Sequence, residues 1–323
     1  MAHQAVIGEA LIDLVLSASP PDAADHGSAV AARPGGGPFN TARTLARLGQ
    51  RVTFLGGLAD DGFGRGLRAS LDRDGVLVGV APLSDVPTTL AVAEVDGGGA
   101  ARYRFYLSGT SAALLDGPTL AAALPADVTM VHAGAVALAM EPIASAIEQV
   151  ITTWLDPSVL VMIDPNCRPA AITDRAGYLA RLWRILSRTD VVKVSTEDLS
   201  YLFPGVAVQR AVSDVLSVGP RLVLVTDGPR PAQAVSASWE VGESVPVVRV
   251  ADTIGAGDAF DGAFLAWWAR GGYDRSSLGE PSVVRDALRF AVEVAALTCT
   301  RVGAEPPLLS DLPDPPALAD PAV

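Results

Sequence analysis

Asp252-Thr253-Ile254-Gly255-Ala256-Gly257-Asp258 is the most informative stretch of this chain, and a run of small and apolar residues follows it to Trp268. Small residues let a backbone approach a ligand closely, and the first turn of a helix has N–H groups without partners. These N–H groups and the helix dipole favour an anion such as a phosphoryl group. Asp258 in that position predicts a general base that takes a proton from an attacking hydroxyl group. The structural alternative is a glycine-rich loop that only closes a helix.

A second glycine loop, Gly35-Gly36-Gly37-Pro38-Phe39-Asn40-Thr41-Ala42, feeds another predicted helix. With these two stretches the sequence resembles the ribokinase-like (pfkB) carbohydrate kinases, which carry GG-x-x-x-N-x-A near the N-terminus and DTxGAGD near the C-terminus. Both signatures occur in this order, and the resemblance runs from about Val6 to Pro307. It implies a three-layer α/β/α fold with a mainly parallel central sheet and a small β lid. It also implies ATP-dependent phosphorylation of a sugar hydroxyl group.

The composition limits the classes of partner. The chain has 323 residues, half of them hydrophobic, and a formal net charge of −12, which disfavours nucleic acids and anionic membranes. Lys193 is the only lysine and follows Val192, so a Gly-Lys-Ser/Thr phosphate loop is excluded. Cys167, Cys299 and three histidines form no metal-binding or disulfide pattern. With no leader or membrane-spanning run, we expect a cytoplasmic protein.

Apolar runs and helical patterns alternate along the chain. Strands are predicted at residues 5–8, 52–55, 89–95, 128–132, 159–163, 191–194 and 222–226. Helices are predicted at residues 39–48, 63–72, 142–155, 176–187, 207–217, 257–270 and 281–300. This alternation favours a mainly parallel sheet covered on both faces. Residues 13–34 and 87–111 interrupt it and are expected to form the lid of a kinase domain over residues 1–305, before a proline-rich tail at 306–323.

The resemblance assigns the catalytic and acceptor residues. Gly255, Ala256 and Gly257 would donate N–H groups to the transferring phosphoryl group, beside the base Asp258. Asp13, which follows an apolar strand at residues 6–12, would accept hydrogen bonds from sugar hydroxyl groups. The remaining candidates are Gly36, Gly37, Asn40 and Asn166 for the acceptor, and Arg168, from the motif Asp164-Pro165-Asn166-Cys167-Arg168, for contact with phosphate or substrate. A helix cap at Asn40 and a surface turn around Arg168 are the structural alternatives.

The resemblance also assigns a nucleotide side. Lys193, Thr226, Gly228, Gly257 and Cys299 would bind the nucleotide, while Glu197 and Asp198 would organise Mg²⁺ through water. Asp198 stands where the family has glutamate, and Pro231 replaces a glycine of the nucleotide loop. The implied cofactors are ATP and Mg²⁺, with K⁺ as an optional third. A homodimer through the lid is a further expectation.

The acceptor stays open at this point. Many fructokinases and 2-keto-3-deoxygluconate kinases have arginine where this chain has Leu107, and leucine cannot clamp a carboxylate. This weakens an acid-sugar assignment. By the fructokinase-like resemblance fructose is the leading substrate, and 2-keto-3-deoxygluconate, ribose and a nucleoside are alternatives. A sensor without turnover is the rival of another class, although a pure binder does not need Asp258. A dinucleotide-dependent oxidoreductase would need a glycine fingerprint after the first strand, which this chain lacks.

Overall fold

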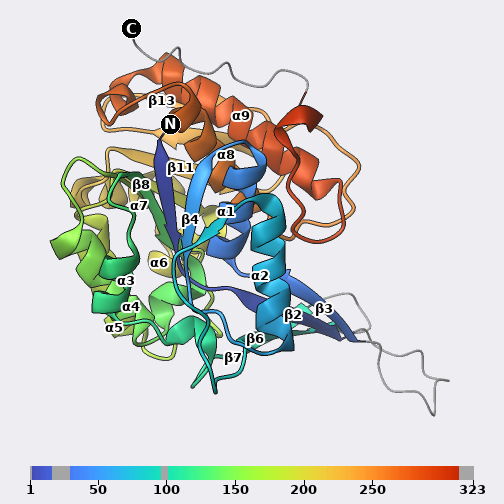
Figure 1. Ribbon diagram of the computed structural model, residues 1–323. Helices are drawn as coiled ribbons and strands as arrows, with labels where there is room; N and C mark the ends of the chain where they lie inside the picture. Colours follow the sequence, from blue (N-terminus) through green and yellow to red (C-terminus); the bar gives the residue numbers. More distant parts are fainter. Residues whose placement is uncertain (1, 17–29, 96–100, 313–323) are drawn as a thin grey trace, which may run out of the picture.

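A computed structural model describes residues 2–16, 30–95 and 101–312 of the chain. In this part a large sheet runs in the order β13-β12-β11-β10-β9-β8-β1-β4-β5 (Figure 1). The strands from β11 to β5 are parallel, and β12 and β13 add an antiparallel edge that was not predicted. Six predicted strands of this sheet are confirmed. The bounds are β1 His3–Ile7, β4 Arg51–Leu55, β5 Leu77–Val78, β8 Val128–Gly134, β9 Leu160–Asp164, β10 Val191–Ser195, β11 Leu222–Asp227, β12 Arg230–Val235 and β13 Glu240–Glu243.

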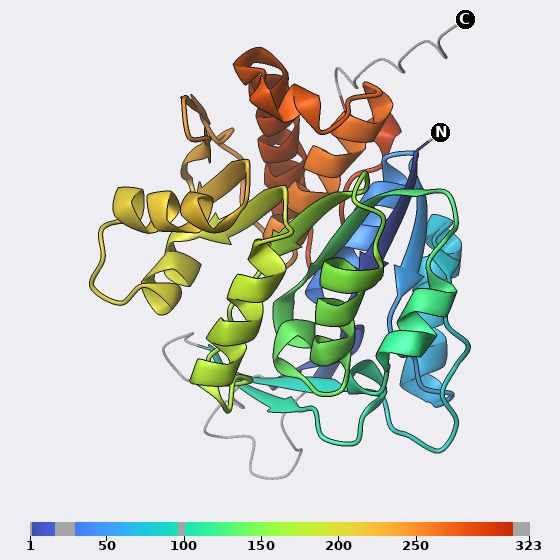
Figure 2. The ribbon, with the colours of Figure 1, turned by 90° about the vertical axis from the view of Figure 1, so that its left-hand side faces the viewer.

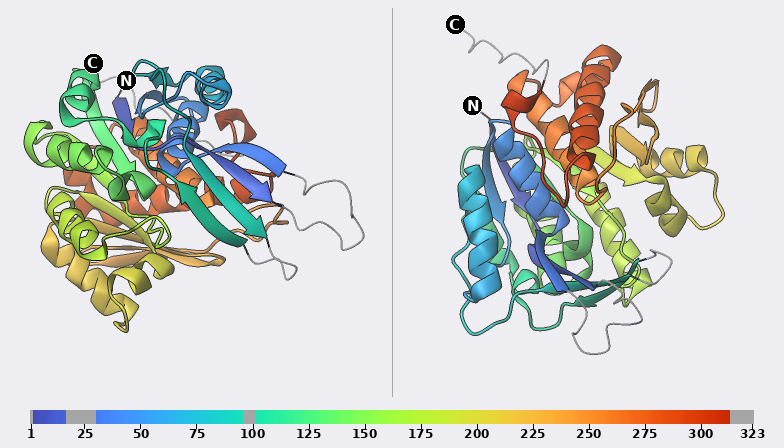
Figure 3. Two further views of the ribbon diagram at one scale, coloured as in Figure 1. Left: turned by 90° about the horizontal axis from the view of Figure 1, so that it is seen from below. Right: turned by 90° about the vertical axis from the view of Figure 1, so that its right-hand side faces the viewer.

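Helices cover both faces of the large sheet and complete the three layers that the sequence predicts. Figure 2 faces one layer, and the right-hand view of Figure 3 faces the other. The first layer contains α3 Gly117–Ala123, α4 Ile143–Gln149, α5 Arg175–Leu186, α6 Thr196–Leu202 and α7 Val208–Val218. The second contains α1 Gly37–Arg47, α2 Gly62–Asp74, α8 Ala256–Arg270 and α9 Pro281–Cys299. None of the described helices is both long and apolar enough to cross a bilayer.

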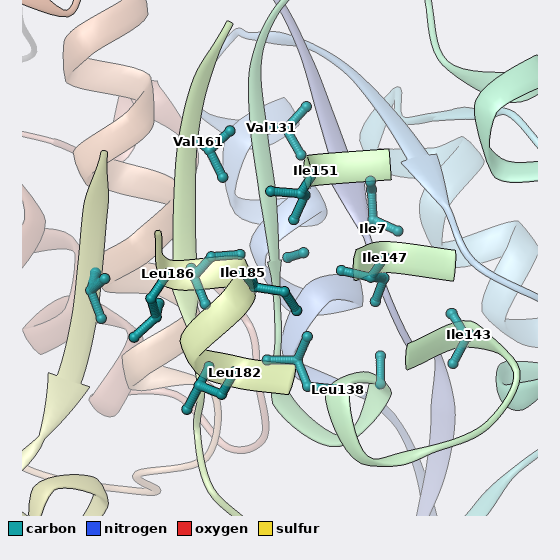
Figure 4. Packing of buried hydrophobic residues seen from close by; sticks show 14 of the residues in the cluster. Ile7, Val131, Leu138, Ile143, Ile147, Ile151, Val161, Leu182, Ile185 and Leu186 are labelled. Carbon is teal, nitrogen blue, oxygen red and sulfur yellow. The ribbon is translucent and has the colours of Figure 1, made fainter. Parts of the chain in front are cut away.

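Each face of the large sheet has its own apolar core. Ile7, Val131 and Val161 contribute to the core under α4 and α5, where they meet Ile147 and Ile185 (Figure 4). Their strand neighbours, such as Val6, Met130 and Met162, belong to the core on the α1 and α8 side. Successive side chains of a strand point to opposite faces, so a strand buried on both sides is apolar at every position. This explains why the predicted strands are continuous apolar runs.

A second, four-stranded sheet projects from the large one in the order β3-β2-β6-β7 (Figure 3). Its strands are β2 Leu11–Leu16, β3 Val30–Gly35, β6 Leu90–Val95 and β7 Ala101–Tyr106. They overlap the predicted lid segments 13–34 and 87–111, with β2 beginning at Leu11 and β3 ending at Gly35, and residues 17–29 and 96–100 lie outside the described residues. One expectation is wrong: residues 6–12 are not one strand. The chain turns between β1 and β2, where Gly8 has φ 152°, and Asp13 therefore lies inside a lid strand.

The first part of the predicted tail packs against the rest of the protein. Arg47 donates to the backbone oxygen of Pro306 at 2.7 Å, and the Leu312 side chain is buried. Arg43 donates to the Ala304 oxygen at 3.0 Å and to the Glu305 carboxylate. These contacts tie residues 304–312 to α1, and residues 313–323 lie outside the described part of the chain.

Candidate active site

The topology of the large sheet indicates where a ligand binds. From β1 the chain proceeds to β4 and β5 on one side, and then returns to β8 on the other side of β1. Ligands of open α/β sheets bind at such a reversal, beyond the carboxyl ends of the strands. The loops after β1, β8, β9, β10 and β11 all open at that edge. They carry most of the residues that the sequence assigned to a site.

Asp258 lies in the first turn of α8, and its side chain is buried. The helix begins after Gly255, whose left-handed φ of 78° turns the chain into it. Asn40 of α1 donates from Nδ2 to Asp258 Oδ2 at 2.8 Å. Burial raises the pKa of Asp258 to about 6, and the hydrogen bond from Asn40 and the nearby Lys193 ammonium act against this rise. A carboxylate in this state is ionised at neutral pH and suits a general base.

The glycine loop of residues 35–37 lies next to Asp258. A Cβ atom on Gly37 would be 3.3 Å from Asp258 Oδ1 and 3.6 Å from Asn166 Nδ2. Gly36 has φ 109°, and a Cβ atom there would come within 2.5 Å of the Glu9 backbone oxygen. The predicted acceptor residues Gly37, Asn40 and Asn166 thus surround the base. Asn40 Oδ1 is buried and has no hydrogen-bond partner in the described part of the chain, so it can accept from a ligand.

Glu9, which the sequence analysis did not single out, organises this region. It follows β1 and is buried, with Oε1 accepting from the Gly37 N–H at 3.1 Å and Oε2 from the Ala137 N–H at 2.9 Å. Burial raises the pKa of Glu9 to about 7, although these N–H groups lower it. The carboxylate joins the loops after β1 and β8 to the start of α1. A charged residue directly after a buried parallel strand was the available signal.

Asp13 reaches the site from the lid. It pairs with Ala91 of β6, and Ala91 pairs with Phe105 of β7, so all three side chains are on one face of the lid sheet. Burial raises the pKa of Asp13 to about 6, the Asp258 carboxylate adds to the rise, and the Arg168 guanidinium counters it. Both charges act on Asp13, so its carboxyl group lies in the neighbourhood of Asp258 and Arg168. Arg168 itself is exposed, and its Nη1 donates to the Asn166 and Cys167 oxygens at 3.3 Å.

Two cavities meet on the other side of Asp258. One, of about 670 Å³, is lined by polar residues that include Asn166, Arg168, Lys193 and Glu197. The other, of about 520 Å³, is mostly apolar and includes Val245, Phe260 and Cys299. Thr226, Asp227, Gly228, Thr253 and Gly257 line both. A polar chamber joined to an apolar one suits an anionic chain attached to a flat ring system.

Lys193 occupies the floor of the polar cavity. Its Nζ is 2.9 Å from Asp164 Oδ2 and 2.9 Å from the position that a Cβ atom on Gly257 would take. Although burial disfavours the ammonium form, the carboxylates of Asp164, Asp261 and Asp198 hold the pKa of Lys193 above its usual range. A fixed positive charge therefore lies under the first turn of α8.

The two predicted metal-organising residues differ in their surroundings. Glu197 is exposed at the start of α6 and lines the polar cavity. Asp198 is buried and already has partners: Oδ1 accepts from the Cys167 N–H at 2.7 Å, and Oδ2 accepts from the Ser195 N–H at 2.8 Å. With Ser195 it forms a capping box that begins α6. Among the described residues, no three His, Cys, Asp or Glu side chains converge as a metal cage.

Comparisons with known proteins agree with this geometry. A family model described as "pfkB family carbohydrate kinase" matches residues 1–311. Fructokinase-1 of Oryza sativa subsp. japonica is 33% identical over 307 residues, which cover 94% of each chain. Fructokinase of Rhizobium leguminosarum bv. trifolii is 33% identical over 259 residues, covering 80% of this chain and 77% of the relative. The crystal structure of fructokinase with bound ATP from Xylella fastidiosa superposes with a TM-score of 0.83 at 29% identity, covering 94% of this chain and 93% of that one.

Proposed function

The chain belongs to the pfkB family of carbohydrate kinases, and we propose that it transfers the γ-phosphoryl group of ATP to a hydroxyl group of fructose. The observation that carries this proposal is the position of Asp258. Its buried carboxylate lies between the acceptor-side residues Asn40 and Gly37 and the polar cavity that Gly257 lines. A hydroxyl group bound beside Asp258 would face a phosphoryl group bound at the start of α8.

The proposed reaction is a direct phosphoryl transfer from ATP to fructose. The fructose oxygen forms a bond to the γ-phosphorus, the bond between that phosphorus and the ADP oxygen breaks, and the hydroxyl proton passes to Asp258. The N–H groups of Gly255 and Gly257 would stabilise the charge on the transferring group, and Arg168 at the rim would add a positive charge. The Ala256 N–H, which the sequence also assigned to this role, already donates to the Thr253 oxygen at 3.3 Å. After ADP and the sugar phosphate leave, Asp258 returns its proton to water. Asp13 holds the acceptor through its hydroxyl groups.

The residues that line the two cavities suit the binding of Mg²⁺ and ATP. Mg²⁺ keeps several waters and is held by one or two carboxylates plus substrate phosphates, which agrees with an exposed Glu197 and with no protein cage among the described residues. When bound, the ion neutralises charge on the phosphates. Lys193, Thr226 and Gly228 would contact the phosphates of ATP, and Cys299 and Phe260 would pack against its adenine ring. Asp198 would act mainly by holding the loop at Cys167. Activation by K⁺ stays a prediction.

The lid favours a neutral acceptor. Leu107 follows β7 two residues after Phe105, and both pack against the apolar core. On the lid face that carries Asp13, the Arg33 guanidinium is already paired with Asp252 at 3.4 Å. The described lid face thus carries the Asp13 carboxylate beside the stacked rings of Tyr103 and Phe105. A carboxylate there suits sugar hydroxyl groups and repels an acidic sugar.

The test is a panel of acceptors assayed by ADP release. Fructose should give the highest kcat/KM, ahead of ribose and adenosine, and 2-keto-3-deoxygluconate should be the poorest. A preference for the acidic sugar would contradict the substrate proposal but leave the kinase assignment intact. Binding of sugar and ATP with no ADP release from any acceptor would favour the sensor instead.

We further propose that two copies pair through the lid sheet. The strand β7 is an edge of the lid sheet, and Tyr106 at its end is 56% exposed, so a second lid could pack there. Light scattering on the purified protein should give the mass of a dimer, and a monomer would contradict this part. A cytoplasmic location stays a prediction from the sequence.

A further inference from the structure

Arg43 is a buried arginine of α1, one helical turn after Asn40, and the proposed reaction gives it no part. Its side chain is only 2% exposed, and all three of its nitrogens have partners. Nε donates to Asp74 Oδ2 at 2.7 Å. Nη1 donates to the Ala304 oxygen at 3.0 Å, and Nη2 donates to the two Glu305 carboxylate oxygens at 3.0 and 3.1 Å. An arginine is rarely buried this far unless it is paired, and these contacts hold the planar guanidinium in one orientation.

Ala304, which Arg43 holds through its backbone oxygen, lies against the loop that begins α8. A Cβ atom on Gly255 would be 2.5 Å from Ala304 Cβ and 3.0 Å from its Cα, so Ala304 fills the space next to this turn. The preceding residue, Gly303, donates its N–H to Asp252 Oδ2 at 2.9 Å. Gly303 and Ala304 therefore hold the loop at its first residue and at its turn into the helix.

The helix α1 thus reaches the site along two routes. The direct route is the hydrogen bond of 2.8 Å from Asn40 to Asp258. The second route runs from Arg43 through Ala304 to Gly255. The proposed base and the N–H groups proposed for the phosphoryl group are therefore both held from one rigid element. A shift of Ala304 would move the loop relative to Asn40, and a displacement of about 1 Å at a reacting centre costs up to about 10²-fold in rate.

Arg47, one turn further along α1, provides a comparison within the same cluster. It shares both acidic partners of Arg43, because its Nε is 2.9 Å from Asp74 Oδ1 and its Nη2 is 2.8 Å from Glu305 Oε2. Its backbone contact differs: Nη1 donates to the Pro306 oxygen at 2.7 Å, two residues beyond the one that lies against α8. The two arginines thus pair with the same carboxylates but hold different parts of the C-terminal segment.

We infer that Arg43 is a positioning residue: by holding the Ala304 backbone oxygen, it fixes the loop at Gly255 relative to Asn40 and Asp258. Its effect on phosphoryl transfer rests on the proposed function. The bracing of the loop does not, because it follows from contacts within the protein.

Arg43→Met and Arg47→Met form a matched pair of variants. Each keeps an unbranched apolar stem and removes one positive charge from the same two carboxylates, so both should unfold at a lower urea concentration than wild type. Only Arg43→Met should lower kcat, by about tenfold or more, with the KM for fructose changed by less than about threefold. Arg47→Met should keep kcat within about twofold of the wild-type value.

Hydrogen exchange of the protein without ligands gives a readout that needs no activity. The amides of residues 252–258 should exchange faster in Arg43→Met than in Arg47→Met, with the amides of α4 as the reference for general stability. Equal exchange in this segment, or an equal loss of kcat in the two variants, would overturn the positioning role.

Faster exchange together with a wild-type kcat would confirm the bracing and contradict the part of the proposed function that assigns this loop to the phosphoryl group. Arg43→Lys keeps the charge but not the fork of donors, and it takes the place of Arg43→Met if that variant does not fold. The same difference from Arg47→Met is then expected.

Discussion

The proposed chemistry depends on the hydrogen bond that Asn40 donates to Asp258. If Asp258 is the base it must be ionised, so kcat/KM for fructose should fall about tenfold per pH unit below about pH 6, the pKa that burial gives Asp258. Asn40→Ala removes a hydrogen bond that stabilises the carboxylate, and the pKa of Asp258 should rise further. The acid limb of the kcat/KM profile should then move up by about one unit. An unchanged limb would show that Asn40 does not support the base.

A substitution of Asp13 tests the proposed binding of the sugar acceptor. Asp13→Ala removes hydrogen bonds to a charged acceptor, each worth about 1.5–3 kcal/mol, so the KM for fructose should rise at least about tenfold. The KM for ATP should change by less than about threefold, because the proposed contacts of Asp13 are to sugar hydroxyl groups only. Initial rates with each substrate varied in turn give both constants. Equal increases would indicate a general disturbance of the lid.

The loop that begins α8 provides a prediction at the scale of elements. Gly255 has φ 78°, and a Cβ atom there would lie 2.5 Å from Ala304 Cβ. Gly255→Ala should therefore cost about 1–3 kcal/mol of unfolding free energy and also lower kcat. Gly62→Ala is the control, because Gly62 begins α2 with nothing within 4 Å of the added atom. Urea denaturation should find the control unchanged or slightly stabilised. Equal stabilities for the two variants would contradict the strain at Gly255.

Two neighbouring acidic residues at the start of α6 are expected to have different roles. Asp198→Asn should cost about 1–3 kcal/mol of stability, because one carboxylate joins the Ser195 and Cys167 backbones and an amide has only one acceptor oxygen. Glu197→Gln should instead leave stability unchanged and raise the Mg²⁺ concentration needed for half-maximal rate by about tenfold. Thermal denaturation and a Mg²⁺ titration measure the two effects. The reverse pattern would give the metal role to Asp198.

Elements with strong local patterns were predictable. The buried parallel strands and the helices α1, α8 and α9 follow directly from apolar runs and periodicity. The break at Gly8–Ala10 was not predictable in this way, because residues 6–12 are apolar enough for one strand and only tertiary contacts place β2 in a second sheet. The edge strands β12 and β13 contain Pro231, Gly242 and several polar residues, and the short helices α3 and α6 cover too few turns for a clear period.

The topology of the whole molecule determines how the site residues meet, which the sequence predicted only in part. The chain reversal beside β1 collects loops from the whole length of the chain at one edge of the sheet, so residues far apart in sequence lie together. Family motifs indicated Asp258, Asn40 and Lys193, but no motif indicated how they touch. Contacts such as Glu9 to Ala137 and Asp261 to His132 depend on the register of several strands and one helix, which a single sequence does not encode in any local pattern.

The role of Asp258 as the base is tested most directly by comparing wild type and Asp258→Asn in phosphorylation of fructose by ATP, at a pH near 8 where Asp258 is ionised. The asparagine keeps the volume of the side chain but cannot accept a proton. If Asp258 is the base, kcat should fall by about 10²–10⁴-fold, while the KM values for fructose and ATP should change by less than about threefold. A variant that retains more than about half of the wild-type kcat would contradict the assignment of Asp258 as the base.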